Sequence, residues 1–462
     1  MSHVIVVDLG YGDAGKGTVV DWLCSPHGRV APGGGTPVHS VVRFNGGAQA
    51  GHNVVTTDGR QHTFAQFGSG TFSSGVRTHL SRFMLVDPLA LAAEAGHLAA
   101  LGVPDALARV TVDRDALLTT PYHRAANQAR ELARGQDRHG SCGMGIGETA
   151  RYALSYPGDA PRAGDCAAPR ALARKLALLR DRLADEVGPP AGVPPVADLC
   201  AAYQAFAAAV PLTGAGYLAG VLRRGRVVFE GAQGILLDEW HGFHPYTTWS
   251  TTTFGNAEAL LAEAGETAVR LGVVRSYLTR HGPGPFVTED PTLELPEPHN
   301  RHGRWQGVFR TGHFDAVALR YAVEVAGGVD AVAVTHLDTV TGRPVRLCRR
   351  YEVDGRPVAR LVPGPERDLA YAERLTAMLL RARPEYTEPG QDWPGVIGQV
   401  LGAPVVLLSR GPTAADKDLA QPLTSQLLTS QPAETAGYLS GRAADRTGHG
   451  RDAVGRDAEA RA

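Results

Sequence analysis

The stretch that decides the fold is Gly10–Thr18, with the sequence GYGDAGKGT, which directly follows the apolar run Val4–Leu9. The apolar run predicts a buried strand, and the apolar residues after the glycines predict the start of a helix. Glycines let backbone N–H groups approach phosphate oxygens, and the N-terminus of a helix adds positive potential. A strand, a glycine-rich turn and a helix in this order therefore predict a phosphate-binding loop.

Three residues of this loop bear on its chemistry. Lys16 can place a positive charge on phosphate oxygens. The next residue is Gly17, so the Ser or Thr that usually ligates Mg²⁺ at this position is missing. Asp13 places a carboxylate beside the expected phosphate, which is repulsive unless the carboxylate holds a metal or moves a proton. Asp13 is therefore the first candidate for catalysis, and the alternative is a generic glycine-rich turn.

Strand-like and helix-like segments alternate along the rest of the chain. The expected strands are Val4–Leu9, Val41–Phe44, Phe83–Val86, Val227–Glu230, Val269–Tyr277, Ala331–Leu337 and Val405–Ser409. The expected helices are Pro88–Leu101, Tyr122–Arg134, Ala168–Glu186, Val196–Ala209, Asp315–Ala326 and Ala370–Arg381. This alternation predicts an α/β fold with a largely parallel central sheet and flanking helices.

The domain organisation follows from the same pattern. We expect one catalytic domain over residues 1–429, with a helical insertion around 165–215. Apolar periodicity is lost from about residue 430, so residues 430–462 are predicted to form a disordered C-terminal tail.

Composition excludes several classes of partner. The 462 residues include 46 basic and 47 acidic side chains, and the net charge of −1 gives no electrostatic reason to expect nucleic acid or a membrane surface. Apolar runs stay well short of 18 residues, so no membrane span is expected. The five cysteines lack a C-x-x-C pair, which argues against a disulfide framework or a zinc site and favours a reducing, cytoplasmic location.

Polar residues follow two other expected strands. In Arg43–Asn53 (RFNGGAQAGHN), small residues let the loop lie close to a ligand, and His52 can donate to a phosphate or act as a general acid. Phe229–Gly234 (FEGAQG) leads to Thr247 and Thr248 and then to the Ser/Thr run Ser250–Thr253, whose hydroxyls can bind a phosphate. Taken alone, a histidine of this kind is more often structural, and a polar turn explains the second segment as well.

Two segments near the C-terminus point to a base. Asp338 ends Thr335–Asp338 (THLD), and its carboxylate can accept two N–H bonds from the Watson–Crick edge of guanine. Ser409–Pro412 (SRGP) can flank the same base. The alternatives are an aspartate that caps the next turn and an ordinary turn.

Taken in order from Val4 to about Leu419, these segments resemble the adenylosuccinate synthetase family. The family's G-D-E-G-K-G-K loop is similar to GDAGKGT, its G-G-x-N-A-G-H-T to GGAQAGHN, its F-E-G-A-Q-G-T-L-L-D to FEGAQGILLD, and its T-K-L-D to THLD. HGFHPYTT, LTRHGPGPFVTE and FRTGHFD likewise match family motifs in the right order. Several matches in one order are specific to the family and less specific to its substrate.

The resemblance implies a GTP-dependent ligase that forms a C–N bond in two steps. Asp13 would take the N1 proton of a 6-oxopurine nucleotide such as IMP, O6 would attack the γ-phosphate of GTP, and an amine, L-aspartate in the family, would displace the phosphate. His52 and Lys16 would hold the transferring group, and Mg²⁺ would lie between Asp13 and the Gly51 carbonyl. The family also implies a cytoplasmic homodimer.

The resemblance also assigns binding residues. The candidates for GTP are Gly12, Gly15, Lys16, Gly17, Thr18, Gly51, Asn53, His336, Asp338, Ser409 and Gly411. The candidates for the purine nucleotide are Asn45, Gln49, Ser141, Cys142, Gln233 and Thr248.

The chain departs from the family at the loop that holds the 5′-phosphate. The family's T-T-G-R-G-I-G is SCGMGIG at Ser141–Gly147, so a hydroxyl and a guanidinium are lost. The family arginine donated to this phosphate across the dimer interface has no clear counterpart, and Arg151 or Arg162 can substitute.

A second departure lies in the loop that grips aspartate. The family's T-T-G-R-R-R-R-T-G is RWQGVFRTG at residues 304–312, which loses three arginines that suit a dicarboxylate. We expect Arg304, Trp305 and Arg310 to contact the second substrate. The alternatives are a paralogue that uses another purine-like nucleotide or another amine, and a non-catalytic nucleotide-binding homologue.

Overall fold

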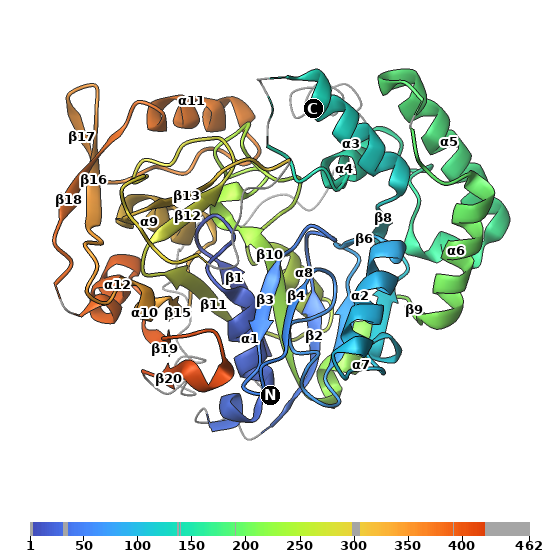
Figure 1. The fold of residues 1–462 in the computed structure, drawn as a ribbon, viewed down its shortest axis with the longest axis horizontal. Coiled ribbons are helices and arrows are strands. Elements are labelled where there is room, and N and C mark those ends of the chain that lie inside the picture. The colour runs from blue at the N-terminus through green and yellow to red at the C-terminus, as the bar shows by residue number, and fades with distance from the viewer. Residues whose placement is uncertain are drawn as a thin grey trace.

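The structure, a computed structural model, describes residues 3–30, 36–135, 138, 140–189, 191–297, 305–390 and 392–420. A large twisted sheet runs through the middle of the molecule, with α2–α6 on one side and β16–β18 with α11 on the other (Figure 1). The stretch 430–462, expected to be a tail, lies outside the described residues.

The central sheet has ten strands in the order β20-β19-β15-β11-β1-β10-β2-β5-β7-β9 within the described chain. Neighbouring strands are parallel, except that β20 runs antiparallel to β19. The strands are β1 (His3–Asp8), β2 (Val38–Arg43), β5 (Arg77–Leu80), β7 (Val110–Asp113), β9 (Leu212–Thr213), β10 (Arg226–Gly234), β11 (Ala268–Arg275), β15 (Ala331–Thr335), β19 (Val405–Ser409) and β20 (Lys417–Leu419).

The remaining strands form small sheets outside the central one. They are β3 (His52–Val55), β4 (Gln61–Phe64), β6 (Leu85–Val86), β8 (Leu117–Leu118), β12 (Leu278–His281), β13 (Phe309–Gly312), β14 (Phe314–Asp315), β16 (Leu347–Val353), β17 (Arg356–Val358) and β18 (Arg383–Thr387).

Helices cover both faces of the central sheet. They are α1 (Lys16–Cys24), α2 (Pro88–Ala100), α3 (Pro121–Ala133), α4 (Ile146–Ser155), α5 (Pro169–Val187), α6 (Val196–Ala209), α7 (Tyr217–Arg224), α8 (Gly255–Ala262), α9 (Ala316–Val325), α10 (Leu337–Val340), α11 (Leu369–Leu379) and α12 (Trp393–Leu401). Short 3₁₀ turns are η1 (Pro26–Val30), η2 (Leu107–Arg109), η3 (Ala163–Ala167), η4 (Ile235–Leu237) and η5 (Ala414–Asp416).

The position of β1 explains why its sequence is apolar throughout. Val4 and Val6 pack in the apolar cluster that contains α1, whereas Ile5 and Val7 pack in the cluster on the opposite face. A parallel strand covered on both faces needs apolar residues at every position, because alternate side chains point to opposite faces. The predicted α/β fold with a largely parallel sheet is confirmed.

The structure corrects one expected strand and places helices in the expected insertion. The expected strand Phe83–Val86 is wrong in extent: only Leu85–Val86 is a strand, and it pairs with β8 outside the central sheet. The central sheet instead takes β5, whose buried Thr78 and His79 hide the apolar pattern of a strand. Helices α5 and α6 occupy most of the stretch 165–215, where helices were expected, and pack against one another.

Within the described ranges, every helix is too short or too polar to cross a membrane.

Candidate active site

The cavity lies where the parallel strands of the central sheet end. Because β1, β2, β10, β11, β15 and β19 run in one direction, the loops after their carboxyl ends meet at one edge of the sheet. These loops line a cavity of about 930 Å³, which is large enough for two nucleotide-sized ligands.

Most residues expected to bind ligands line this one cavity. From the catalytic and GTP-binding sets these are Asp13, His52, Gly12, Gly15, Lys16, Gly17, Thr18, Gly51, Asn53, His336, Asp338, Ser409 and Gly411. From the purine-binding set they are Gln49, Ser141, Cys142, Gln233 and Thr248. The fold therefore gathers residues from Gly12 to Gly411, nearly the whole described chain, around one cavity.

The phosphate-binding loop is held in shape by Asp8, the last residue of β1. One carboxylate oxygen of Asp8 accepts hydrogen bonds from the N–H groups of Gly10 (2.7 Å) and Gly12 (3.3 Å). The other accepts from the Ala14 N–H group at 2.6 Å. Asp8 is fully buried, and its role was not predicted from the sequence, although an acid at the end of an apolar strand was a visible signal.

Glycine is required at Gly12 and Gly15, because both have positive φ angles, 110° and 89°. Gly15 is also the N-cap of α1 and, within the described chain, receives no side-chain cap. The first N–H groups of α1 are therefore left for a ligand at the cavity, as expected for a phosphate cradle.

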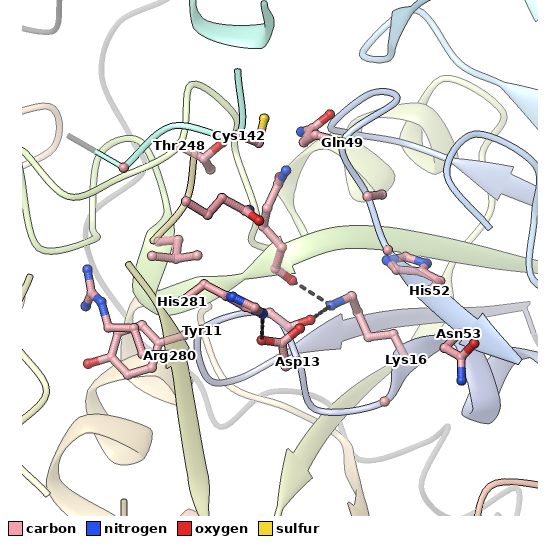
Figure 2. Close-up of a pocket in the computed structure, with 18 of the residues that line it drawn as sticks. Tyr11, Asp13, Lys16, Gln49, His52, Asn53, Cys142, Thr248, Arg280 and His281 are labelled. Atoms are coloured by element: carbon pink, nitrogen blue, oxygen red, sulfur yellow. Dashed lines mark hydrogen bonds and ion pairs between the residues drawn. The ribbon is translucent and has the colours of Figure 1, made fainter. Parts of the chain in front are cut away.

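Lys16 ties the loop to the neighbouring strand β10. Its Nζ donates to the carbonyl oxygens of Gln233 (2.7 Å) and Gly12 (3.0 Å), and Figure 2 shows Lys16 at the base of the cavity. The same Nζ lies 3.4 Å from Asp8 Oδ2. Lys16 is almost fully buried, so its charge is fixed at the base of the loop, where phosphate oxygens would lie.

Asp13 lines the cavity, and its Oδ2 is buried in a contact with His281. Among the described residues, Oδ2 has no hydrogen-bond partner, and His281 Nε2 lies 3.4 Å away as an ion-pair contact (Figure 2). Burial raises the pKa of Asp13, and the charges of His281 and Arg275 oppose that shift. A carboxylate with a raised pKa is a stronger base than an ordinary aspartate.

His52 forms a buried pair with Glu230. His52 Nδ1 lies 2.6 Å from Glu230 Oε1, and Ser69 donates both its N–H and its hydroxyl to the same carboxylate. Burial lowers the pKa of His52 to about 4, although the Glu230 charge opposes that shift. Burial alone would raise the pKa of Glu230, but His52 and Arg43 lower it to about 2.

This pair fixes the imidazole ring and directs Nε2 to the cavity that His52 lines. Glu230 was not predicted as a site residue; its signal was an acid inside the apolar run of β10.

Two glutamines that line the cavity, Gln49 and Gln233, have buried polar atoms without hydrogen-bond partners among the described residues. These atoms are both polar atoms of the Gln49 side chain and Oε1 of Gln233. Buried polar atoms without partners are uncommon in native proteins and indicate a missing ligand or water. Gln233 also has a φ of 59°, a strained conformation for a non-glycine residue.

The residues expected to contact a base, Asp338, His336 and Ser409, also line the cavity. Asp338 is exposed to the cavity from the first turn of α10, next to His336, whose φ of 57° turns the chain there. Ser409 follows at the end of β19, with its hydroxyl 3.2 Å from the Gly411 carbonyl.

Three of the expected residues do not line the cavity, and a fourth is not described. Asn45 Nδ2 donates to the Ala232 carbonyl at 3.0 Å, and Asn45 Oδ1 accepts from the Ala232 N–H group at 2.7 Å. Asn45 therefore joins two loops and does not line the cavity. Arg310 pairs with Glu289 at 2.8 Å and likewise does not line it. Trp305 packs against the backbone of Gly143 rather than lining the cavity. Arg304 lies outside the described residues.

Of the two arginines considered as substitutes for the missing family arginine, Arg151 lines the cavity. Arg162 instead donates to the carbonyl of Asp115.

The residues present fit a magnesium ion that arrives with a nucleotide. The described part of the chain contains no group of three His, Cys, Asp or Glu side chains that could hold a metal by themselves. Mg²⁺ bound to phosphates needs only one or two protein ligands. The second oxygen of Asp13, Oδ1, and the nearby Gly51 loop suit that role, because both residues line the cavity.

A phosphate cradle at the edge of a parallel sheet, with a carboxylate and a histidine above it, defines an α/β nucleotide-binding enzyme. The chain matches the family model described as adenylosuccinate synthetase over residues 5–386 and belongs to this family of GTP-dependent ligases.

Two bacterial relatives show how far the similarity extends. Adenylosuccinate synthetase from Myxococcus xanthus (strain DK1622) is 32% identical over 459 residues, covering 91% of this chain and 99% of that protein. The synthetase from Anaeromyxobacter sp. (strain K) is 36% identical over 383 residues, covering 79% of this chain and 84% of that protein.

Two solved structures share the fold. Fully ligated adenylosuccinate synthetase from Plasmodium falciparum matches with a TM-score of 0.74 at 21% identity, covering 91% of this chain and 100% of the other. Succinoaminodeoxyadenylate synthetase of cyanophage S-2L, bound to dGMP and to dATP as an energy donor, matches with a TM-score of 0.51 at 18% identity, covering 92% and 97%. At these identities they support the fold alone.

Proposed function

We propose that this protein is a GTP-dependent ligase that phosphorylates the 6-oxo group of an IMP-like purine nucleotide and replaces it with an amine, L-aspartate in the family. The observation that carries the proposal is the position of Asp13. Its carboxylate has an oxygen free of hydrogen bonds within the described chain, a raised pKa and a place in the phosphate-binding loop itself.

In the first step, Asp13 Oδ2 accepts the N1 proton of the 6-oxopurine, and the electron pair moves to O6. O6 attacks the γ-phosphorus of GTP, and the bond to the β–γ bridging oxygen breaks to give GDP. Lys16 and the backbone N–H groups of the loop stabilise the phosphate charge. Mg²⁺ held by Asp13 and the Gly51 carbonyl would neutralise the charge on the phosphates.

His52 contributes through its pairing with Glu230. The buried Glu230 carboxylate stabilises a proton on the ring when a phosphate dianion approaches, so Nε2–H can donate to the transferring group. In the second step, the amine attacks C6, inorganic phosphate leaves, and the amine loses a proton. Asp338 would accept the N1–H and amino hydrogens of guanine, which favours GTP.

A second candidate has the same chemistry and a different purine or amine. It is favoured by the cavity wall at Ser141–Gly147, which lacks the family's arginine, and by Arg310, which pairs with Glu289 instead of facing the cavity.

The assembly and location are proposed from the family. We propose a homodimer, which light scattering on the purified protein would test. We also propose a cytoplasmic location, which fits five cysteines that are all free thiols in the structure.

The test is phosphate release from GTP with purified protein, Mg²⁺ and IMP, with and without L-aspartate, and with the purine product identified by mass. Aspartate-dependent release with a succinyl-purine product is expected from the first candidate. Turnover only with another purine or amine supports the second. GTP binding without turnover of any purine would indicate a non-catalytic homologue and contradict the proposal.

A further inference from the structure

One wall of the cavity carries charged side chains that the proposed chemistry does not use. Glu131 and Arg134 at the end of α3, with Glu148 and Arg151 of α4, line the cavity. The Glu131 side chain is 1% exposed and that of Glu148 is 7% exposed. We call these four residues the α3–α4 wall.

The α3–α4 wall adjoins the loop Ser141–Gly145. The Asn127 amide joins the two, because its Nδ2 donates to Ser141 Oγ at 2.9 Å and its Oδ1 accepts from Gly145 N–H at 3.1 Å. By resemblance, this loop meets the end of the substrate that would carry a 5′-phosphate.

The cations of the wall are already neutralised. Arg151 donates to Glu148 Oε2 from Nε at 3.2 Å and from Nη2 at 3.0 Å, and it also pairs with Glu186. Arg130, behind the wall, pairs with both Glu148 and Glu186. Arg134 donates to Glu131 Oε1 at 2.8 Å. Three carboxylates, Glu131, Glu148 and Glu186, therefore offset the charge of three guanidiniums, so a phosphate dianion would bring uncompensated negative charge to this wall.

The N-terminus of helix α4 does not replace the arginines as a site for phosphate. It begins after Gly145 without a side-chain cap from the described residues, so its first N–H groups would attract an anion. Glu148 lies in the first turn and already places a negative charge at this end of the helix. A phosphate would therefore meet a carboxylate where the helix would otherwise favour it.

Glu131 supplies the feature that selects a ligand. Its Oε2 is buried and has no hydrogen-bond partner within the described part of the chain, whereas its Oε1 is occupied by Arg134. A buried carboxylate oxygen is stabilised by a hydrogen-bond donor and repels an anion. The neighbouring Cys142 thiol is neutral, because burial raises its pKa to about 11.

We propose that the α3–α4 wall binds a hydroxyl of the substrate through Glu131 Oε2, and that the preferred purine is a nucleoside rather than its 5′-phosphate. This inference rests on the proposed function, because it names the substrate class for the same site, and it deepens the second candidate.

The test is calorimetric binding of inosine and IMP to the full chain, loaded with Mg²⁺ and a non-hydrolysable GTP analogue. We expect inosine to bind about tenfold or more tightly than IMP, the range of one charge-assisted hydrogen bond. Tighter binding of IMP would overturn this inference and leave the proposed ligase intact. Binding of the GTP analogue without either purine would overturn both.

Variants locate the effect. Glu131→Gln keeps an acceptor for Arg134 and should lower the preference for inosine over IMP about tenfold. Glu148→Gln should improve IMP binding, because it removes the charge that competes with phosphate for Arg151. The control Glu263→Gln changes an exposed acid paired with Arg82 and should leave the preference unchanged. Retained binding of the GTP analogue shows that each variant is folded, and an unchanged preference in both wall variants would refute the assignment.

Discussion

Replacing Asp8 by asparagine should uncouple the phosphate-binding loop from the sheet. Both oxygens of Asp8 are acceptors: Oδ1 for the N–H groups of Gly10 and Gly12, and Oδ2 for the Ala14 N–H group and Lys16. An asparagine presents one oxygen and one NH₂ group, so one of these two sets must face a donor.

The magnitude follows from these contacts. Hydrogen bonds to charged acceptors contribute about 1.5–3 kcal/mol each, and a buried donor left without an acceptor costs about 1–3 kcal/mol. We expect Asp8→Asn to lose about 3–5 kcal/mol of unfolding free energy and to weaken GTP binding about tenfold or more, because the loop loses its geometry.

The assay is urea denaturation, together with GTP binding measured well below the unfolding midpoint. Asp238→Asn is the matched control, because Asp238 is also buried and accepts from the N–H groups of Trp240, His241 and Thr252. The control should lose stability and keep its GTP affinity. Equal GTP affinity in Asp8→Asn and the wild type would refute the role given to Asp8.

Three other predictions concern the site and its support. Glu230→Gln should lower kcat about ten- to a hundredfold at unchanged GTP affinity, because the His52 ring loses its ionic partner; an unchanged kcat would contradict the pairing. Burial raises the pKa of Asp21 to about 7, so the folded chain retains a proton that the unfolded chain releases above about pH 4, and stability falls as pH rises from 4 to 7. Asp21→Asn removes this loss and should be about 2–4 kcal/mol more stable than the wild type at pH 7 and similar near pH 4 in denaturation curves; a difference independent of pH would be the opposing result. Gly234→Ala would place Cβ 2.1 Å from a carbonyl oxygen of the phosphate-binding loop and should cost about 1–3 kcal/mol in melting experiments. The control is Gly96→Ala in α2, where the added Cβ meets no described atom within 4 Å, and it should gain about 0.5–1 kcal/mol of stability. Similar effects of the two changes on stability would argue against the close approach at Gly234.

The parts of the fold that the sequence predicts well are those covered on both faces. Strands β1, β10, β11, β15 and β19 are apolar runs because each is buried between layers of helices, and all five were expected near their observed positions. Strand β5 was not expected, because it contains the polar residues Thr78 and His79. In the fold His79 is buried and its ring pairs with Thr111 of β7, a contact that the sequence does not show.

The site was predictable where glycines and chemistry-bearing residues follow a strand, as at Asp13, Lys16 and His52. Asp8 and Glu230 were not predicted, because both lie in strands and their partners, the backbone of the loop and His52, are set by the folded structure.

The α3–α4 wall shows what the sequence could not reveal. Glu131 and Glu148 lie on different helices, and only the packing of α3 against α4 brings both to one cavity. Arg310 is the converse case: its sequence position suggested a ligand contact, but Glu289 on a neighbouring segment pairs with it.

The most direct measurement is positional isotope exchange in GTP that carries ¹⁸O at the β–γ bridge, with Mg²⁺, the purine that binds, and no amine. If Asp13 activates the 6-oxo group for attack on the γ-phosphate, the label should scramble into the non-bridging β positions only when the purine is present. The exchange should be lost in Asp13→Asn, although that variant still binds GTP. Absence of exchange in the wild type, or exchange that survives in Asp13→Asn, would contradict the assignment of Asp13 as the base of the first step.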